Sequence, residues 1–214
     1  LADVAFKTGQ NVQGFPEYGP ERMGAPITAY NRISSDTIRV HSNIYHPDYV
    51  VVVDETLLAS VDVTAGLKKT GAIIINTPKS KEEVMDELED YEGRVYTVDA
   101  RKISVETLGK NFPNSPMLAA AVAVSNIMPR DKFIHEMRAS YEHKFAKKPE
   151  VIDGNMKALE RAYDVVEEAI EEMKPEMKNI DETSKQALVD GGMTLIEYDD
   201  SFYQEILALD TVQA

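Results

Sequence analysis

The sequence predicts an α/β protein with three layers, α/β/α, built around a mixed, mostly parallel sheet and followed by a small C-terminal α/β appendage. Three short, largely apolar segments support this prediction: residues 49–53, 72–76 and 94–98. Strands that read as nearly continuous apolar runs are typical of parallel sheets buried on both faces. Helical patterns separate the three segments, which indicates βαβ crossovers. We therefore expect these strands at the centre of the sheet.

The first forty residues are expected to form a helix, a stiff loop and a hairpin. Leu1 and Val4 fall on one helical face, and Gly9 is placed to end that helix. Residues 27–33 and 37–41 both alternate around a turn, so we expect a hairpin that joins the same sheet. Because the chain opens without methionine in what reads as the middle of a helix, we expect its natural N-terminus to lie upstream.

Helices are expected after the buried strands and through most of the second half. Asp54 is positioned to cap a short helix, and the small residues after Pro116 favour a closely packed one. A long amphipathic helix is expected to end at Pro175, since proline disrupts a helix interior. The expected longer helices cover residues 81–91, 116–127, 129–145, 150–173, 181–189 and 201–209, with one further strand at 193–198.

Charge and hydropathy exclude several classes of partner. The net charge is −14, and eleven acidic residues against three lysines between Glu171 and Ala214 account for −8 of it. Such a chain is a poor fit to nucleic acid, because neutralising a phosphate backbone needs clustered Lys and Arg. No apolar run approaches the roughly 20 residues that a membrane-spanning helix needs. We therefore expect a protein that binds neither nucleic acid nor membrane, and a cytoplasmic one, because a chain without cysteine fits a reducing compartment.

Residues that commonly carry chemistry are sparse. There is no cysteine, so no disulfide, thiol nucleophile or cysteine-held iron–sulfur cluster lies within these residues. The histidines, His41, His46, His135 and His143, match no metal-binding spacing and are interpreted as structural or solvated. No phosphate-binding loop, dinucleotide glycine motif or serine elbow is present. We expect no catalytic residue here, and no metal or cofactor bound by this chain alone.

Two carboxylates, Asp54 and Asp99, follow predicted strands, where open α/β sheets place ligand-binding groups. Helix N-caps occupy the same position, and Asp54 before Glu55 and Thr56 is a favourable cap. Capping is therefore the favoured interpretation. A free-standing nucleotide-binding α/β protein, which would use the strand ends near Asp54, Asn76 and Asp99, remains an alternative.

The stretch between the first helix and the expected hairpin is the strongest candidate for a binding element. Phe15–Pro26 contains three prolines and two glycines and lacks helical or strand periodicity, so it should hold one backbone path. Stiff loops on a folded scaffold commonly carry binding residues. A merely structural connection is the alternative. The candidate contacts to a partner or substrate are Tyr18, Gly19, Glu21, Arg22, Gly24 and Pro26.

Several longer motifs give the chain a resemblance to a known family. The sequence resembles the gamma subunit or domain of 2-oxoacid:ferredoxin oxidoreductases, most closely the pyruvate synthase branch. A gamma–delta fused relative such as an oxalate oxidoreductase is an alternative. The resemblance extends over about residues 1 to 170, in which the motifs are Phe15–Pro26, AYNRI at 29–33, DETLL at 54–58, INTP at 75–78, PNSPML at 113–118 and VIDGNMKALERA at 151–162.

The resemblance implies a division of the chain into two parts. Residues 1–172 correspond to a gamma-type domain from which the family's usual first strand and glycine-rich turn are missing. Residues 173–214 are an acidic C-terminal extension or linker, outside the ordinary gamma subunit. Some members fuse a ferredoxin-like delta domain with two iron–sulfur clusters to gamma, but this tail contains no cysteine and holds no cluster itself.

The resemblance also implies a reaction, the oxidative decarboxylation of a 2-oxoacid such as pyruvate or oxalate. In that complex the carbonyl chemistry is supplied by thiamine diphosphate with Mg, and electrons leave through 4Fe–4S clusters to ferredoxin. Coenzyme A takes the acyl group when the substrate is pyruvate. These groups are held mainly by alpha, beta and delta subunits or domains, so the gamma chain is expected to be inactive alone. A purely structural assembly domain is a third interpretation.

Overall fold

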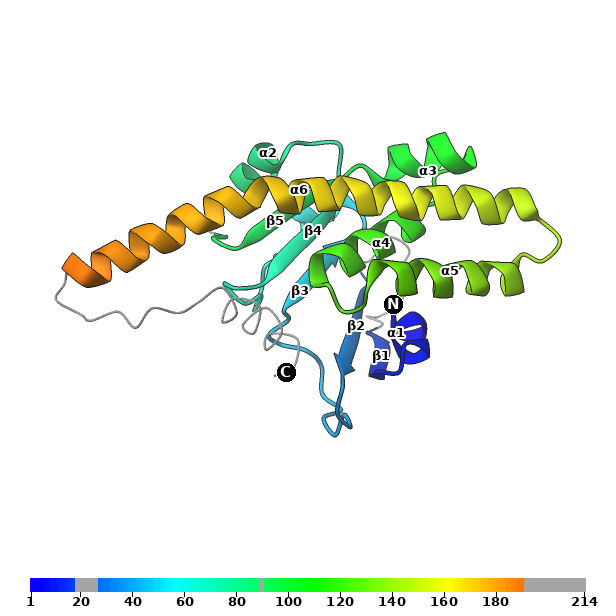
Figure 1. Ribbon diagram of the computed structural model, residues 1–214, viewed down its shortest axis with the longest axis horizontal. Coiled ribbons are helices and arrows are strands. Elements are labelled where there is room, and N and C mark those ends of the chain that lie inside the picture. The colour runs from blue at the N-terminus through cyan, green and yellow to red at the C-terminus, as the bar shows by residue number, and fades with distance from the viewer. Residues whose placement is uncertain (18–26, 89–90, 191–214) are drawn as a thin grey trace. The chain divides into compact units, whose positions relative to one another are not determined.

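The computed structural model describes residues 1–17, 27–88 and 91–190, with side chains as far as residue 173 (Figure 1). The chain divides into two units, residues 1–166 and residues 167–214. The contacts reported below lie within the first unit, and the expected domain boundary after residue 172 stays a prediction. In chain order the elements are α1 (Ala2–Lys7), β1 (Asn11–Glu17), β2 (Thr28–Ser34), β3 (Tyr49–Val52), the 3-10 helix η1 (Glu55–Ala59), β4 (Ala72–Asn76), α2 (Lys81–Glu87), β5 (Arg94–Val98), α3 (Ala100–Leu108), α4 (Asn114–Ser125), α5 (Arg130–Lys144) and α6 (Pro149–Asp190).

A parallel three-stranded sheet in the order β3-β4-β5 lies at the centre of the first unit (Figure 1). In its register Val51 pairs with Ile74, and Ile74 pairs with Tyr96. Every residue of β4 is buried, which accounts for its unbroken apolar sequence. Burying one isoleucine side chain is worth about 1.5–3 kcal/mol, so β4 contributes strongly to stability. Among the described strands, however, only β4 is central, because β3 and β5 lie at the edges.

Helices cover both faces of this sheet. On one face Ile73 and Ile75 pack with Val84 of α2, and the partly buried Leu58 extends the same cluster. Strand alternation points Ile74 to the opposite face, and α4 contacts β3 and β4. Alanines make up much of α4, and their short side chains permit close packing on the strands. The predicted α/β class with a parallel sheet is confirmed.

Residues 100–108 form a helix, α3, that was not expected from the sequence. It ends at Gly109, whose φ of +68° is a left-handed conformation that glycine adopts without strain. The long helix α6 passes close to this end, where a Cβ at Gly154 would lie 2.7 Å from the Leu108 side chain. Helix packing therefore explains the glycine in the VIDGNMKALERA motif.

The expected hairpin is wrong in its pairing. The strand β2 coincides closely with the predicted first strand, but its antiparallel partner is β1, and residues 37–41 have no strand structure. The antiparallel strands expected within a mixed sheet are instead a separate two-stranded sheet, β1-β2, called the ribbon below. Gly14 and Pro16 interrupt the strand pattern of β1, and both residues weaken a strand prediction.

Two helix ends also differ from expectation. The helix α2 ends at Glu87 and not near residue 91, and α6 continues past Pro175 to Asp190, so it includes the helix expected at 181–189. A proline removes one backbone donor and bends a helix, but residues beyond it can remain helical. The strand and helix expected at 193–198 and 201–209 lie outside the described residues. Within the described ranges, no helix is both long enough and apolar enough to cross a membrane.

Candidate functional site

The carboxyl edge of the parallel sheet gathers the strand-end carboxylates noted in the sequence. Asp54 accepts hydrogen bonds from the Thr56 N–H (3.0 Å) and hydroxyl (2.8 Å) and thereby caps η1. These bonds, the backbone one first, lower the pKa of Asp54 below its usual value. Asp99 accepts from the Lys102 N–H at 2.8 Å and caps α3. The capping interpretation is confirmed for both carboxylates.

Asn76, from the INTP motif, joins three segments at this edge. Its buried side chain donates to the Val53 carbonyl (2.8 Å) and accepts from the Ala100 N–H (3.0 Å). The end of β3, the end of β4 and the start of α3 are thereby held together. A buried amide group loses its hydrogen bonds to water, and these two bonds compensate for that loss. Asn76 is therefore a structural residue.

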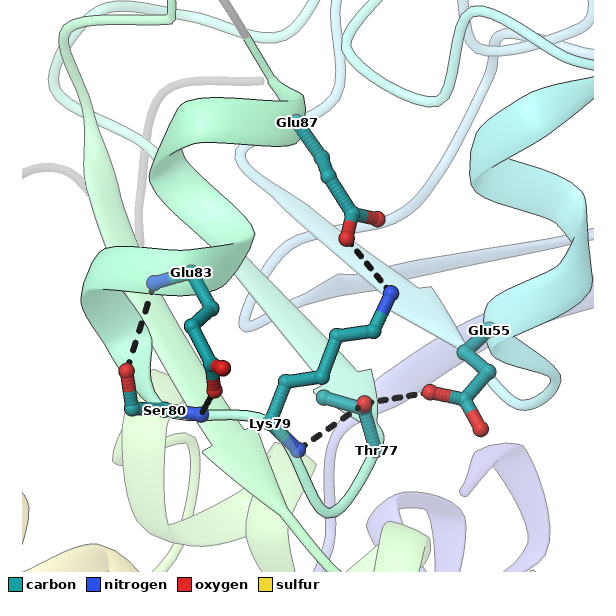
Figure 2. Close-up of polar contacts among 6 residues, drawn as sticks. All are labelled: Glu55, Thr77, Lys79, Ser80, Glu83 and Glu87. Atoms are coloured by element: carbon teal, nitrogen blue, oxygen red, sulfur yellow. Dashed lines mark hydrogen bonds and ion pairs between the residues drawn. The ribbon is translucent and has the colours of Figure 1, made fainter.

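Thr77 continues the network toward α2, as Figure 2 shows. Its buried hydroxyl donates to the Glu55 carboxylate and accepts from the Lys79 N–H at 3.2 Å. The Lys79 side chain in turn forms an ion pair with Glu87 at the end of α2. The polar side chains of this edge are thus engaged with one another.

The start of α2 is closed by a reciprocal pair in the same view (Figure 2). The Ser80 hydroxyl accepts from the Glu83 N–H at 3.2 Å, and the Glu83 carboxylate accepts from the Ser80 N–H at 2.8 Å. This capping box satisfies two backbone donors that the helix itself cannot. The polar groups described at this carboxyl edge therefore have structural roles in caps and in bonds between segments.

The histidines lie at separate places in the described structure. His41 shares a hydrogen bond with Gln13 at 2.9 Å, and His135 lies 3.4 Å from the neighbouring Glu136. Over residues 1–17, 27–88 and 91–173, no three His, Asp or Glu side chains converge where a metal ion could bind.

A pocket of about 550 Å³ lies beside the segments that precede β4 and β5. Its wall combines apolar side chains such as Leu58 and Leu67 with the Lys69–Glu92 ion pair (2.8 Å). The hydroxyl of Tyr91 is buried, with no hydrogen-bond partner among the described residues, and burial raises the pKa of Tyr91. No sequence pattern indicated this pocket, because its wall comes from segments far apart along the chain.

The loop predicted to be a binding element lies outside the described residues. The roles of Tyr18, Gly19, Glu21, Arg22, Gly24 and Pro26 therefore stay a prediction. The strands β1 and β2 flank this loop, and β1 includes Phe15, Pro16 and Glu17, so the expectation of no strand character is wrong for that end. Each strand of a two-stranded sheet is an edge strand, and such strands tolerate proline.

The ribbon brings together five side chains that were not singled out as candidates. Gln13 pairs across the strands with Arg32, and Phe15 with Tyr30, whose ring centroid lies 5.2 Å away. The Tyr30 hydroxyl donates to Glu17 at 2.7 Å. We call these five residues the ribbon face. The AYNRI motif contains two of them and was the available signal.

Comparison with known proteins gives a consistent set of relatives. A family model described as pyruvate ferredoxin/flavodoxin oxidoreductase matches residues 1–165. The common gamma subunit of the pyruvate/ketoisovalerate oxidoreductases of Thermococcus kodakarensis is 42% identical over 163 residues, covering 76% of this chain and 85% of that protein. The pyruvate synthase subunit PorC of Thermotoga maritima is 42% identical over 166 residues, covering 78% and 84%.

Two solved structures are similar to this chain. The crystal structure of the pyruvate oxidoreductase subunit PORC from Thermotoga maritima superposes with a TM-score of 0.64 at 38% identity, covering 76% of this chain and 84% of that one. The gamma subunit of a keto/oxoacid ferredoxin oxidoreductase from Geobacter sulfurreducens gives a TM-score of 0.58 at 15% identity, covering 77% and 86%. At that identity the second likeness concerns the fold alone.

Proposed function

The chain belongs to the pyruvate ferredoxin/flavodoxin oxidoreductase family, and we propose from this premise that it is the gamma subunit of a complex that oxidatively decarboxylates a small 2-oxoacid. The observation that carries the proposal is the 42% identity to relatives named as gamma and PorC subunits, over at least 84% of their length. The electrons released by the reaction would pass to ferredoxin, and the complex would work in the cytoplasm.

The side chains of this chain support a non-catalytic role within that complex. Asp54, Asn76 and Asp99, which lie where an α/β enzyme often places its chemistry, are engaged in caps and a segment-joining bond. The hydroxyl groups of Thr56 and Thr77 at this edge donate to Asp54 and Glu55, carboxylates that belong to the same structural network. We therefore place the reacting groups on other subunits, and expect this chain to contribute shape, stability and contacts.

The implied cofactors are assigned to the other parts of the complex. An iron–sulfur cluster needs several cysteine thiolates, and this sequence has none, so its residues do not fit such a cluster. We place thiamine diphosphate, Mg and the 4Fe–4S clusters on alpha, beta and delta subunits or domains. Coenzyme A is proposed as the co-substrate that accepts the acyl group, and no step of the reaction is assigned to this chain.

Pyruvate is the first substrate to test. The relatives' names specify pyruvate and ketoisovalerate, which share a 2-oxoacid group and differ in the size of the side chain. A subunit common to two such enzymes cannot by itself discriminate between their substrates, so we place specificity elsewhere in the complex. Oxalate belongs to the same test, because it carries a second carboxylate in place of the acyl group of pyruvate and would need no coenzyme A to accept an acyl group.

The loop at residues 18–26 is proposed as a docking element. It connects the two strands of the ribbon, and its prolines restrict the backbone before binding, which lowers the entropy cost of association. Arg22 would make a charge-assisted contact with a partner carboxylate or with anionic coenzyme A. If Glu21 pairs with Arg22 instead, the loop is only a structural connection between the two strands.

The proposed function is tested by co-expressing this chain with alpha, beta and delta subunits and purifying the product. We expect one complex that absorbs visible light through its clusters and reduces ferredoxin with a 2-oxoacid. Activity is measured for pyruvate, ketoisovalerate and oxalate, each with and without coenzyme A. The isolated chain should be inactive and should show no thiamine diphosphate binding by calorimetry. If the chain does not associate with these subunits and binds a nucleotide by itself, the result would instead support a free-standing nucleotide-binding protein.

The loop is tested in the same complex with Arg22→Ala. We expect either loss of assembly or a raised Michaelis constant for coenzyme A or the 2-oxoacid. Arg138, exposed on α5, supplies the matched control as Arg138→Ala, which should change neither. If both variants assemble and react like the parent, residues 18–26 are a structural connector.

A further inference from the structure

The two faces of the ribbon have different neighbours. On one face the helix α1 contacts both strands, and a Cβ added at Gly14 would lie 3.2 Å from the Ala2 Cβ. Side chains alternate along a strand, so Gln13 and Phe15 point to the opposite face. Their cross-strand partners share that face because paired residues in an antiparallel sheet project to the same side. The ribbon face is therefore the side that α1 does not cover.

The side chains of the ribbon face are held in place by one another. The Phe15 and Tyr30 rings are in contact, and the Tyr30 hydroxyl is fixed by Glu17. Arg32 donates to Gln13 and to the carbonyls of residues 40 and 42, at 3.2 and 3.1 Å. Such mutual restraint removes side-chain freedom before any partner binds, which lowers the entropy cost of association.

The ribbon has no hydrophobic core of its own. No residue of β1 or β2 is buried, and a two-stranded sheet alone is at best marginally stable in water. Large apolar side chains are exposed beside it, with Ile27 at 66% and Val40 at 55%. Phe15 and Tyr30 are half-buried, and the exposed Ile27 and Val40 extend the apolar surface beside them.

The part of the chain that includes the ribbon contains no lysine. Residues 8–67 contain no lysine, three arginines, four tyrosines and one phenylalanine, although the whole chain is rich in charge. Aromatic residues and arginine are enriched at interfaces and lysine is depleted, because arginine and aromatic rings lose less freedom on burial and make larger contacts. The absence of lysine from residues 8–67 matches the lysine depletion of interfaces.

The charge of the ribbon face indicates the chemistry of its partner. Residues 11–48 carry three arginines against four acidic residues, a balance of −1, which leaves −13 for the rest of the chain. The described hydrogen-bond partners of Arg32 are neutral, namely Gln13 and two carbonyls, so its charge is available to a carboxylate. A second copy of this chain fits poorly, because two chains of net charge −14 repel each other.

We propose that the ribbon face is a docking surface for another subunit of the oxidoreductase, one that places an apolar side chain on Phe15 and Tyr30 and a carboxylate on Arg32. This inference rests on the proposed function, since it needs a multi-subunit complex. It differs from the proposed role of the loop at residues 18–26, which can fail or succeed separately. Aromatic and arginine anchors of this kind commonly supply most of the energy of an interface.

The test uses the co-expressed complex with Phe15→Ala and Arg32→Gln, each compared with the parent. Association is followed by native mass spectrometry on dilution, over a range of salt concentrations. We expect each variant to dissociate at about tenfold or more higher concentration than the parent. The salt dependence of the parent should weaken in Arg32→Gln, because one interfacial charge pair is lost. Val105→Ala and Arg138→Gln, at exposed positions of α3 and α5, are the controls and should leave dissociation unchanged.

The outcomes separate this inference from the proposed function. A parent chain that never joins the other subunits overturns the proposed function and the docking surface with it. A parent that assembles normally, with both ribbon variants equally stable on dilution, overturns the docking surface alone. Weakening by Arg32→Gln with an unchanged salt dependence would show that Arg32 only holds residues 40–42, and would overturn the carboxylate contact. Self-association of the isolated chain that Phe15→Ala abolishes would identify a second copy as the occupant and overturn the choice of partner.

Discussion

The parallel sheet and the ribbon represent two ways of ordering strands in one chain. In β4 every residue is buried, whereas neither strand of the ribbon has a buried residue. The parallel sheet is stabilised by apolar area removed from water, which needs no further partner. The ribbon is ordered by polar and aromatic pairs on an exposed surface, and such pairs are individually worth about 0.2–1 kcal/mol. The difference indicates that the sheet stabilises the subunit and that the ribbon is available for contacts.

Both regions use one polar side chain to hold a neighbouring segment, and the comparison shows what burial adds. Asn76 is buried and bonds to Val53 and Ala100, while Arg32 is half-buried and bonds to the carbonyls of residues 40 and 42. Removing a buried partner leaves polar atoms that water cannot reach. When an exposed hydrogen-bond partner is removed, water takes its place. The loss of unfolding free energy is therefore smaller for the exposed side chain than for the buried one.

The largest expected effect is that of Ile74→Asp. Ile74 is 0% exposed in the central strand, and an aspartate there would bury an unpaired charge. We expect a loss of at least about 4 kcal/mol in unfolding free energy, or a chain that does not fold. The measurement is chemical denaturation of the purified chain, followed by circular dichroism.

The matched variant is Val51→Asp, at the register position opposite Ile74 in β3. The sequence predicts that Val51 lies in a buried central strand, and this is wrong, because its side chain is 38% exposed on an edge strand. We expect a loss of only about 1–2 kcal/mol, of the size of a strand-propensity change with partial burial. Equal losses for the two variants would mean that the Val51 side chain is as well covered as that of Ile74.

A middle-sized effect is expected for Asn76→Ala. The substitution leaves the buried Ala100 N–H without its partner and removes the part-buried bond to the Val53 carbonyl, which should cost about 2–3 kcal/mol. The control in the ribbon is Asn11→Ala, which removes an exposed bond to the Ser35 carbonyl and should cost no more than about 0.5 kcal/mol. Thermal unfolding of both variants measures the difference, and a larger loss for Asn11→Ala would reverse the comparison.

The smallest effect concerns the pH dependence of the ribbon. The hydrogen bond to Glu17 raises the pKa of Tyr30 above its usual value. Because the folded pKa is raised, the stabilisation is fully present below pH about 10 and is lost as pH rises through the folded pKa. In an NMR titration of labelled tyrosine, Glu17→Gln should lower the pKa of Tyr30. If the pKa of Tyr30 is the same in Glu17→Gln as in the parent, the hydrogen bond to Glu17 does not stabilise the ribbon.

Local sequence was sufficient where one property decided the structure. The runs at 72–76 and 94–98 coincide with β4 and β5, because apolar strands buried on both faces leave an unmistakable pattern. The caps at Asp54 and Asp99 could be predicted for a similar reason, since a carboxylate one residue before a helix bonds to nearby N–H groups. In these cases each decisive contact lies within a few residues or follows directly from hydropathy.

Local sequence was insufficient where partners lie far apart. The pairing of β2 with β1 instead of residues 37–41 depends on α1 covering one side of the ribbon and on Arg32 holding residues 40 and 42. The ribbon face was missed for the same reason, since Phe15 and Tyr30 meet only after the strands pair. The role of residues 18–26 stays a prediction.

The sequence by itself determined the α/β class, the position of the buried strands, the family motifs and the absence of any cysteine ligand, because each depends on composition or on neighbours along the chain. Only the tertiary structure decided which strand is central, that Asn76 is a structural residue, and that five side chains form one ribbon face beside an uncovered apolar surface. These properties are set by burial and by contacts across the sheet. A side chain's exposure and hydrogen-bond partners depend on segments distant in the sequence, and no local pattern encodes them.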